Sequence, residues 1–219
     1  MNQTSKLKYL ILAAAASLGL AIAAAAQSAD TVVTAPAPVE AGPGLLGSGY
    51  TSVTFRYTDL DNGPPSARRG VELAFNQPLQ AGLDFKLGYD WSRASADPIR
   101  LTFQDLNAGV AAYTKLEWGK PFVQALGGWE WRRGGGTADS SFAYTLGTGV
   151  EFQVAPAVVL TPYVNFVRAT GFNRSELDYG VKATYRVNRQ WSVSAGYEYD
   201  AVRHTKDQNV YTLGVNYHY

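Results

Sequence analysis

Ten consecutive stretches of this chain alternate between apolar and polar residues, and the alternation continues to the last residue. The final stretch, VYTLGVNYHY (210–219), places five apolar or aromatic side chains on one face: Tyr211, Leu213, Val215, Tyr217 and Tyr219. Alternation with a period of two residues predicts β-strands. Because chain ends usually fray, we expect a last strand with so regular a face to be held by pairing with the first strand.

The other nine apolar faces follow one another from Tyr50 onward. The ten faces extend over Val53–Tyr57, Val71–Phe75, Leu83–Trp91, Leu106–Leu116, Val123–Trp131, Phe142–Phe152, Leu160–Phe166, Leu177–Val187, Trp191–Tyr199 and Tyr211–Tyr219. The opposite phase carries thirteen charges: Arg56, Glu72, Asp84, Lys86, Asp90, Asp105, Lys115, Glu130, Glu151, Asp178, Lys182, Arg186 and Glu198. The apolar phase carries none.

A soluble β-sandwich also alternates, but the composition of the apolar faces argues against it. A sandwich core is dominated by aliphatic residues and Phe, whereas these faces are rich in Tyr and Trp, which suit a membrane interface. Trp118 and Trp191 fall at one set of strand ends, and Trp91, Trp129 and Trp131 fall at the other. This distribution predicts two aromatic girdles.

The connections between the stretches alternate in length. Short turns follow Asn76, Trp118, Val154 and Val187, and longer polar segments cover 59–70, 94–103, 133–140, 170–176 and 200–209. Short turns on one side and long loops on the other are typical of outer-membrane barrels. In lipid every backbone N–H and C=O needs a protein partner, so a sheet that crosses a membrane must close on itself. We therefore predict a closed antiparallel transmembrane β-barrel over 49–219, with ten strands, or eight if weak stretches merge with their neighbours.

The first 48 residues have a different character. Lys6 and Lys8 precede an uncharged run, YLILAAAASLGLAIAAAA (9–26), which predicts a signal peptide over 1–26 with cleavage before Gln27, or alternatively after Ala29. A retained membrane anchor is the other interpretation of this run. Residues 27–48 are rich in Ala, Pro, Gly and Ser, and we expect a flexible periplasmic linker. The chain has no Cys, which excludes disulfides.

Three segments resemble OmpA-like and opacity-protein-like outer-membrane β-barrels. They are YGVKATYRVNRQWSVSAGYEY (179–199), LGTGVEFQVAPAVVLTPYVNF (146–166) and the terminal YTLGVNYHY. The last resembles the carboxyl-terminal signal that the barrel-assembly machinery recognises in such proteins, although Tyr replaces the more frequent Phe. The resemblance implies an exported monomer of the cell outer membrane, in contact with lipid and lipopolysaccharide. Many members of the family have eight strands.

The inward charges bear on function. A barrel of eight to ten strands is narrow enough for side chains to fill, and eight acidic and five basic groups are expected to pair with one another. We therefore predict a largely plugged barrel with a structural or surface-interaction role. A narrow porin-like channel for small solutes is the alternative. Nothing in the sequence suggests a cofactor, and no basic stripe suggests a nucleic-acid partner.

A surface hydrolase is a further alternative, which we do not favour. Its candidate groups are Asp59 and Asp61 in the first predicted loop and Asp200, His204 and Asp207 in the last. They loosely resemble the pairs of omptin proteases, but with different spacing. Ser140 and Ser141 have no His nearby in the sequence, and two His without Cys make no usual metal-ligand cluster.

Two arginine pairs and a glycine run fall in or beside the predicted loops. Arg68-Arg69 and Arg132-Arg133 are candidates for contacts with lipopolysaccharide phosphates, or simply mark where strands leave the lipid. The run Gly134–Gly136 is expected to form a flexible loop tip and no phosphate site, because no helix follows it.

Overall fold

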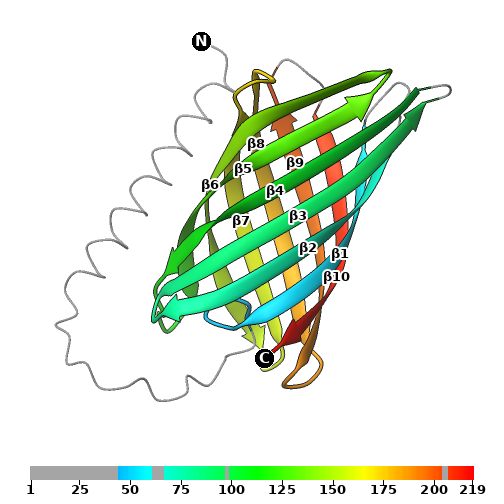
Figure 1. Cartoon of the computed structure of the whole chain (residues 1–219). Coiled ribbons are helices and arrows are strands. Elements are labelled where there is room, and N and C mark those ends of the chain that lie inside the picture. Colours follow the sequence, from blue (N-terminus) through cyan, green and yellow to red (C-terminus); the bar gives the residue numbers. More distant parts are fainter. Residues whose placement is uncertain (1–43, 61–66, 97–98, 204–206) are drawn as a thin grey trace, which may run out of the picture.

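The computed structural model describes residues 44–60, 67–96, 99–203 and 207–219, which form one closed antiparallel barrel (Figure 1). Its ten strands are β1 (Tyr50–Asp59), β2 (Ala67–Gln80), β3 (Leu83–Ala96), β4 (Ile99–Tyr113), β5 (Lys120–Gly134), β6 (Thr137–Ala155), β7 (Val158–Ala169), β8 (Arg174–Arg186), β9 (Trp191–Val202) and β10 (Gln208–His218). Each strand pairs with its sequence neighbours. In the described part of the chain, no helix is long and apolar enough to cross a membrane.

The barrel closes between β1 and β10, as the regular last stretch predicts. The register runs from Tyr50 opposite His218 to Asp59 opposite Asn209. The terminal Tyr219 donates its backbone N–H to the carbonyl of Gly49 at 3.2 Å. Ten strands are therefore confirmed rather than eight, and the last strand is held along its whole length. We refer to the end of the barrel where β1 begins and β10 ends as the proximal end, and to the opposite end as the distal end.

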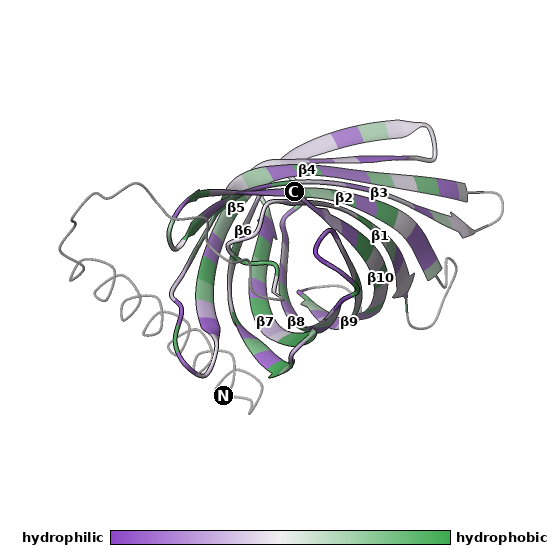
Figure 2. Cartoon of the chain, turned by 90° about the horizontal axis from the view of Figure 1, so that it is seen from below, coloured by the Kyte–Doolittle hydropathy of each residue, from purple (hydrophilic) through white to green (hydrophobic). Residues whose placement is uncertain are grey.

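The two faces of the strands are separated as the alternation predicts. Phe55 and Leu213 on the apolar phase expose 64% and 62% of their surface to the outside, whereas Asp84 on the charged phase is completely buried. Figure 2 shows hydrophilic and hydrophobic positions alternating along the strands that surround the lumen. A sandwich would turn the apolar faces toward each other, so this arrangement rules it out. The apolar surface of the barrel is a lipid-facing surface.

Aromatic side chains lie near both ends of this outer surface. Trp191 packs against Tyr217 at the proximal end, with ring centroids 5.0 Å apart. Nearer the distal end, Trp129 contacts Phe142 edge to face at 5.3 Å. Trp118, in the connection after β4, is 56% exposed. These positions agree with the two predicted girdles.

The predicted contrast between short turns and long loops is confirmed only in part: the longest connection, 60–66, lies at the distal end, but two other distal connections are two residues long. Several strands continue through segments that were expected to be loops, so that only residues 135–136 separate β5 from β6 and only residues 97–98 separate β3 from β4. Residues 137–142 of β6 pair with β5 alone, because the pairing of β6 with β7 begins at Ala143. The polar segment 133–140 is therefore a hairpin that extends distally beyond β7. Outside lipid, such a hairpin needs no apolar face, which is why its sequence looks like a loop.

The tip of this hairpin is a two-residue turn and not a long flexible loop. Gly135 and Gly136 both have positive φ, 59° and 83°. Two central residues with positive φ are what a type I′ turn requires, and glycine adopts that conformation without strain. Gly135 and Gly136 thus form the tight turn that joins Gly134 to Thr137.

Two further predictions need correction. Lys115 lies exposed in the connection after β4, where an isolated bridge joins Leu116 to Gly119, so it does not face the lumen. The segment Gly44–Ser48, expected to belong to a flexible linker, enters the proximal end of the barrel and is partly buried there. We call this segment the strap. The predicted signal peptide and residues 27–43 lie outside the described residues and remain predictions.

Candidate functional site

The strap is held in the proximal mouth by carboxylates that point inward from the barrel wall. The backbone N–H groups of Leu45 and Leu46 donate to Oε1 of Glu151 at 2.9 and 3.1 Å. The N–H of Gly47 donates to Oδ2 of Asp84 at 2.9 Å. Both carboxylates are at least 95% buried. Hydrogen bonds to charged acceptors are stronger than those to neutral ones. These two inward carboxylates therefore bind the strap backbone.

Side chains of the wall also bind the strap's oxygen atoms. Nζ of Lys120 donates to the carbonyl of Leu46 at 2.8 Å, and Nδ2 of Asn76 donates to the carbonyl of Ser48 at 2.9 Å. The Ser48 hydroxyl lies 2.7 Å from Nδ1 of His218 on the last strand. Contacts from β2, β5 and β10 therefore fix the strap from several sides of the mouth.

The strap also makes an apolar contact with the barrel interior. Leu46, 5% exposed, packs with Ala111 and Phe122, and Tyr113 and Tyr163 lie against this group. Among the described residues this is the hydrophobic cluster of the barrel interior, and a residue of the strap is at its centre. Burial of one leucine side chain contributes about 1.5–3 kcal/mol. The strap is thus held in the proximal mouth by packing as well as by hydrogen bonds.

A first arginine bridges the lumen above the strap. Arg56 on β1 lies 3.4 Å from Glu72, 3.7 Å from Asp90 and 3.4 Å from Glu198. Glu198 also accepts a hydrogen bond from the Tyr163 hydroxyl at 2.9 Å. These partners belong to β2, β3, β7 and β9, so the network ties together distant parts of the wall.

A second arginine bridges the lumen nearer the distal end. The guanidinium of Arg174 on β8 donates to both oxygens of Glu130 on β5 at 3.0 Å, and its Nε donates to Glu176 at 2.9 Å. Arg132 lies 3.4 Å from Glu130 and stacks over the ring of Phe172 at 4.0 Å. Arg174 and Glu176 were not predicted to be lumenal, because residues 170–176 were expected to form a loop.

Four carboxylates stand in direct register across neighbouring strands. Glu72 on β2 is opposite Asp90 on β3, which is opposite Asp105 on β4, which is opposite Glu130 on β5. We call these residues the carboxylate row. Like charges directly opposite each other are destabilising, so the two bridging arginines are needed to offset the row. The expected pairing of acidic with basic groups in the lumen is therefore present only in part.

The lumen retains open space between the strap and the second arginine bridge. A cavity of about 370 Å³ is lined by Leu45 and Leu46 at the strap and by Arg174 toward the distal end. Its wall includes the carboxylate row. The strap therefore occupies the proximal mouth, while the lumen beyond it is not filled throughout.

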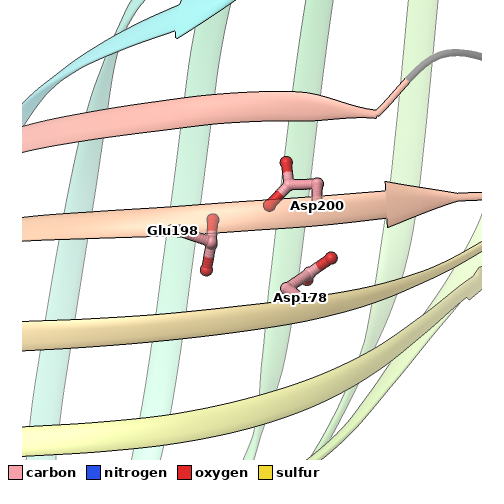
Figure 3. A group of neighbouring side chains, drawn as sticks. All are labelled: Asp178, Glu198 and Asp200. Carbon is pink, nitrogen blue, oxygen red and sulfur yellow. The ribbon is translucent and has the colours of Figure 1, made fainter. Parts of the chain in front are cut away.

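Three acidic side chains on the β8–β9 wall form a separate group. Asp178 on β8 and Glu198 and Asp200 on β9 lie next to one another (Figure 3). One carboxylate oxygen from each lies within 4.8 Å of the other two. Oxygen ligands of this kind suit hard divalent cations. No His or Cys spacing marks this group in the sequence, because its members come together only through the strand register.

Those hydrolase candidates that lie in the described part of the chain do not come together in one site. Asp59 ends β1, whereas Asp200 is a buried lumenal residue of β9 and not part of a loop. Asp207 accepts hydrogen bonds from the Tyr199 hydroxyl at 2.5 Å and from the Val202 N–H at 3.2 Å. These bonds tie Asp207 to the end of β9. Asp61 and His204 lie outside the described residues.

The remaining candidates have structural contacts. Ser141 on β6 is 4% exposed; its hydroxyl donates to the Phe142 carbonyl at 3.0 Å and accepts from the Gly171 N–H at 2.7 Å. The two arginine pairs are split between the faces of the wall. Arg68 lines the lumen and lies 3.5 Å from Gln208, while Arg69 is exposed on the outer surface. Arg132 and Arg133 divide between the two faces in the same way.

Solved outer-membrane barrels resemble this structure. An outer-membrane channel from Pseudomonas putida F1 matches 84% of this chain and 100% of its own with a TM-score of 0.51 and 11% identity. Neisserial surface protein A matches 78% and 96% with a TM-score of 0.43 and 14% identity. The translocator domain of the autotransporter NalP from Neisseria meningitidis matches 95% and 97% with a TM-score of 0.46 and 11% identity.

Sequence comparisons add nothing to these structural matches. No protein-family model matches the chain, and no curated protein sequence matches it. At such low identity the likeness to the Pseudomonas channel shows the fold alone. That fold is the transmembrane β-barrel of the bacterial outer membrane.

Proposed function

We propose that this protein is a closed outer-membrane barrel with a structural or surface-interaction role and not an open pore. The strap is the observation that carries the proposal. It occupies the proximal mouth with five backbone groups bonded to side chains of the wall, and it buries Leu46. A solute that crossed the lumen would have to displace these contacts.

The arginine bridges support the same proposal at two further levels. Arg56 binds carboxylates of three strands, and Arg174 joins β8 to β5. Removing one partner from a buried ion pair costs about 3–5 kcal/mol. The side chains that cross the lumen are therefore held firmly, which favours a rigid scaffold over a wide aqueous channel.

The distal end carries an outer surface suited to anionic lipid. Arg69 and Arg93 stand directly opposite each other on β2 and β3, and both are exposed on the outside. Arg133 is exposed on the same surface, two strands away. Arg binds phosphate in a bidentate manner, and an anion between two guanidiniums in direct register would relieve their repulsion. We propose that lipopolysaccharide phosphates fill this role, with the distal end outside the cell and the strap in the periplasm.

A gated cation channel is the second candidate function. The 370 Å³ cavity and the carboxylate row that lines it would favour cations if the strap moved aside. In this case the strap would act as a gate.

Conductance separates these functions. Purified wild-type protein in planar lipid bilayers is expected to give no stable current, and a variant lacking residues 44–48 is the comparison. Stable open-channel current from the wild type would overturn the closed-barrel proposal. Current from the shortened variant alone would identify the strap as the seal. Silence from both would leave the barrel closed and assign the closure to the arginine bridges.

A further inference from the structure

The acidic group on the β8–β9 wall contains a pair that the protein does not neutralise. Asp178 and Asp200 face each other directly in the β8–β9 register. They are 6% and 5% exposed, and Glu198 lies beside them. Two carboxylates directly opposite each other repel, and burial in a medium of low dielectric constant strengthens the repulsion. The pair therefore needs a positive partner.

No protein group in the described part of the chain supplies that partner at contact distance. Oδ1 of Asp178 and Oδ1 of Asp200 are both buried without a hydrogen-bond partner. A buried polar atom left in this way costs about 1–3 kcal/mol, and more when it is charged. Two such atoms on facing residues, both beside a third carboxylate, indicate that a ligand binds between them.

Two arginines near this group, Arg56 and Arg174, already bind other carboxylates, and a third, Arg68, hydrogen-bonds to Gln208, which is opposite Asp200 in the register, at 3.5 Å. Arg56 reaches Glu198 but also binds two residues of the carboxylate row. Arg174 binds Glu130 and Glu176 through three of its nitrogen atoms. Overall, the cavity lining has eight carboxylates and six basic side chains. The lining therefore has two more carboxylates than basic side chains, and Asp200, opposite Asp178, adds a further carboxylate.

From this geometry we propose that Asp178, Glu198 and Asp200 bind a divalent cation inside the lumen, and that the cation is Ca²⁺. Ca²⁺ takes six to eight oxygen ligands at about 2.3–2.6 Å, so two oxygens on one ion lie no more than about 5 Å apart. The three carboxylates meet this limit without movement of the backbone. Asp178 and Glu198 also line the cavity, which has room for the waters that complete the coordination shell.

The residues around Glu198, the third proposed ligand, keep its side chain in place. Gly180 is opposite Glu198 in the register, and the space that a side chain would fill there is occupied by the Tyr163 ring. The Tyr163 hydroxyl donates to one Glu198 oxygen, and Arg56 donates to the other. A carboxylate has about four lone-pair sites, so Glu198 retains capacity for a metal. The bound ion would join β8 to β9 in the distal half of the lumen, and this proposal does not depend on whether the lumen conducts.

Calcium titration of the refolded full barrel tests the proposal. The protein is prepared in lipopolysaccharide-free detergent micelles, stripped with a chelator, and titrated with CaCl₂ by calorimetry. We expect one saturable Ca²⁺ site per chain and a higher unfolding midpoint when Ca²⁺ is present. Mg²⁺ is expected to bind more weakly, because it keeps its waters and demands a strict octahedron. Absence of any saturable Ca²⁺ effect on the wild type, as a shared proton between the two aspartates would give, overturns the proposal.

The variants Asp178→Asn and Asp200→Asn supply the specific readout. Each is expected to lower the Ca²⁺ association constant by about tenfold or more, since even outer-shell changes at metal sites cost that much. In chelator each should be at least as stable as the wild type because the like-charge repulsion is relieved, whereas in Ca²⁺ each should be less stable. A purely structural role for the aspartates would not reverse the order. Wild-type Ca²⁺ affinity in both variants would overturn the proposal.

A matched control and a second probe keep the result interpretable. Asp105→Asn removes a lumenal carboxylate from the carboxylate row and should leave Ca²⁺ binding unchanged. Tb³⁺ in place of Ca²⁺ should emit when tyrosine is excited, because the Tyr163 hydroxyl bonds directly to a proposed ligand. Tyr163→Phe should reduce this Tb³⁺ emission, and in the separate calcium titration the same variant should still bind Ca²⁺. Equal emission from Asp178→Asn and the wild type would place the ion elsewhere and refute the site.

Discussion

Replacing Glu151 by alanine tests whether the strap is the seal of the lumen. Glu151 accepts the N–H groups of Leu45 and Leu46 at 2.9 and 3.1 Å and lies 3.8 Å from Nζ of Lys120. The substitution removes all three interactions but leaves Leu46 and the rest of the wall in place. We expect the strap to leave the mouth more often, and the barrel to open in proportion.

The size of the effect follows from the two lost hydrogen bonds. A hydrogen bond to a charged group contributes about 1.5–3 kcal/mol. Two of them at the lower limit give about 3 kcal/mol, which shifts the docking equilibrium of the strap by about a hundredfold. Glu151→Gln keeps the Oε1 acceptor and loses only the charge. A loss of about 1.4 kcal/mol, or tenfold, is expected for that variant.

Single-channel recording in planar bilayers measures these shifts as open probability. The control is Glu117→Ala, which removes an exposed carboxylate from the β4–β5 connection at the same end of the barrel. We expect open probability to rise in the order wild type and Glu117→Ala, then Glu151→Gln, then Glu151→Ala. If the variant lacking residues 44–48 conducts while Glu151→Ala stays as silent as its control, the reasoning about Glu151 is refuted.

Two further predictions concern the stability of the barrel in lipid vesicles. Arg56→Met leaves Glu72, Asp90 and Glu198 without their shared cation and should lower the free energy of unfolding by about 1–3 kcal/mol, because these ion pairs are only partly buried; an unchanged urea midpoint would contradict the bridging role. Leu213→Arg places a charge on the outer surface near the middle of β10 and should cost about 2–4 kcal/mol, against about 0–1 for Tyr185→Arg at the proximal boundary. Equal costs at the two positions would argue against lipid contact along β10.

The course of the wall could be predicted from the sequence because a strand period of two is a local property. Val53, Phe55 and Tyr57 face outward as their alternation requires, and the pairing of β1 with β10 follows from the need to close the sheet. Lys115 was misplaced because the connection after β4 interrupts the alternation. The distal hairpin was missed because a strand with water on both sides carries no apolar face.

The lumen could not be predicted in the same way because its contacts depend on register and on distant segments. The strap residue Leu46 is 105 positions from Glu151, and the composition of its segment resembles a linker. Asp178 and Asp200 come to face each other only when β8 and β9 are aligned residue by residue. A shift of one residue in the β8–β9 register would separate the two aspartates. The alternation of apolar and polar residues does not determine that register.

Spin-label accessibility along β10 tests the central claim, which is that the apolar phase touches lipid and the other phase faces the lumen. The chain has no Cys, so single cysteines at positions 211–216 can be labelled cleanly. We predict that labels at 211, 213 and 215 collide with lipid-soluble oxygen and that labels at 212, 214 and 216 do not. A reversed or absent alternation would contradict the account.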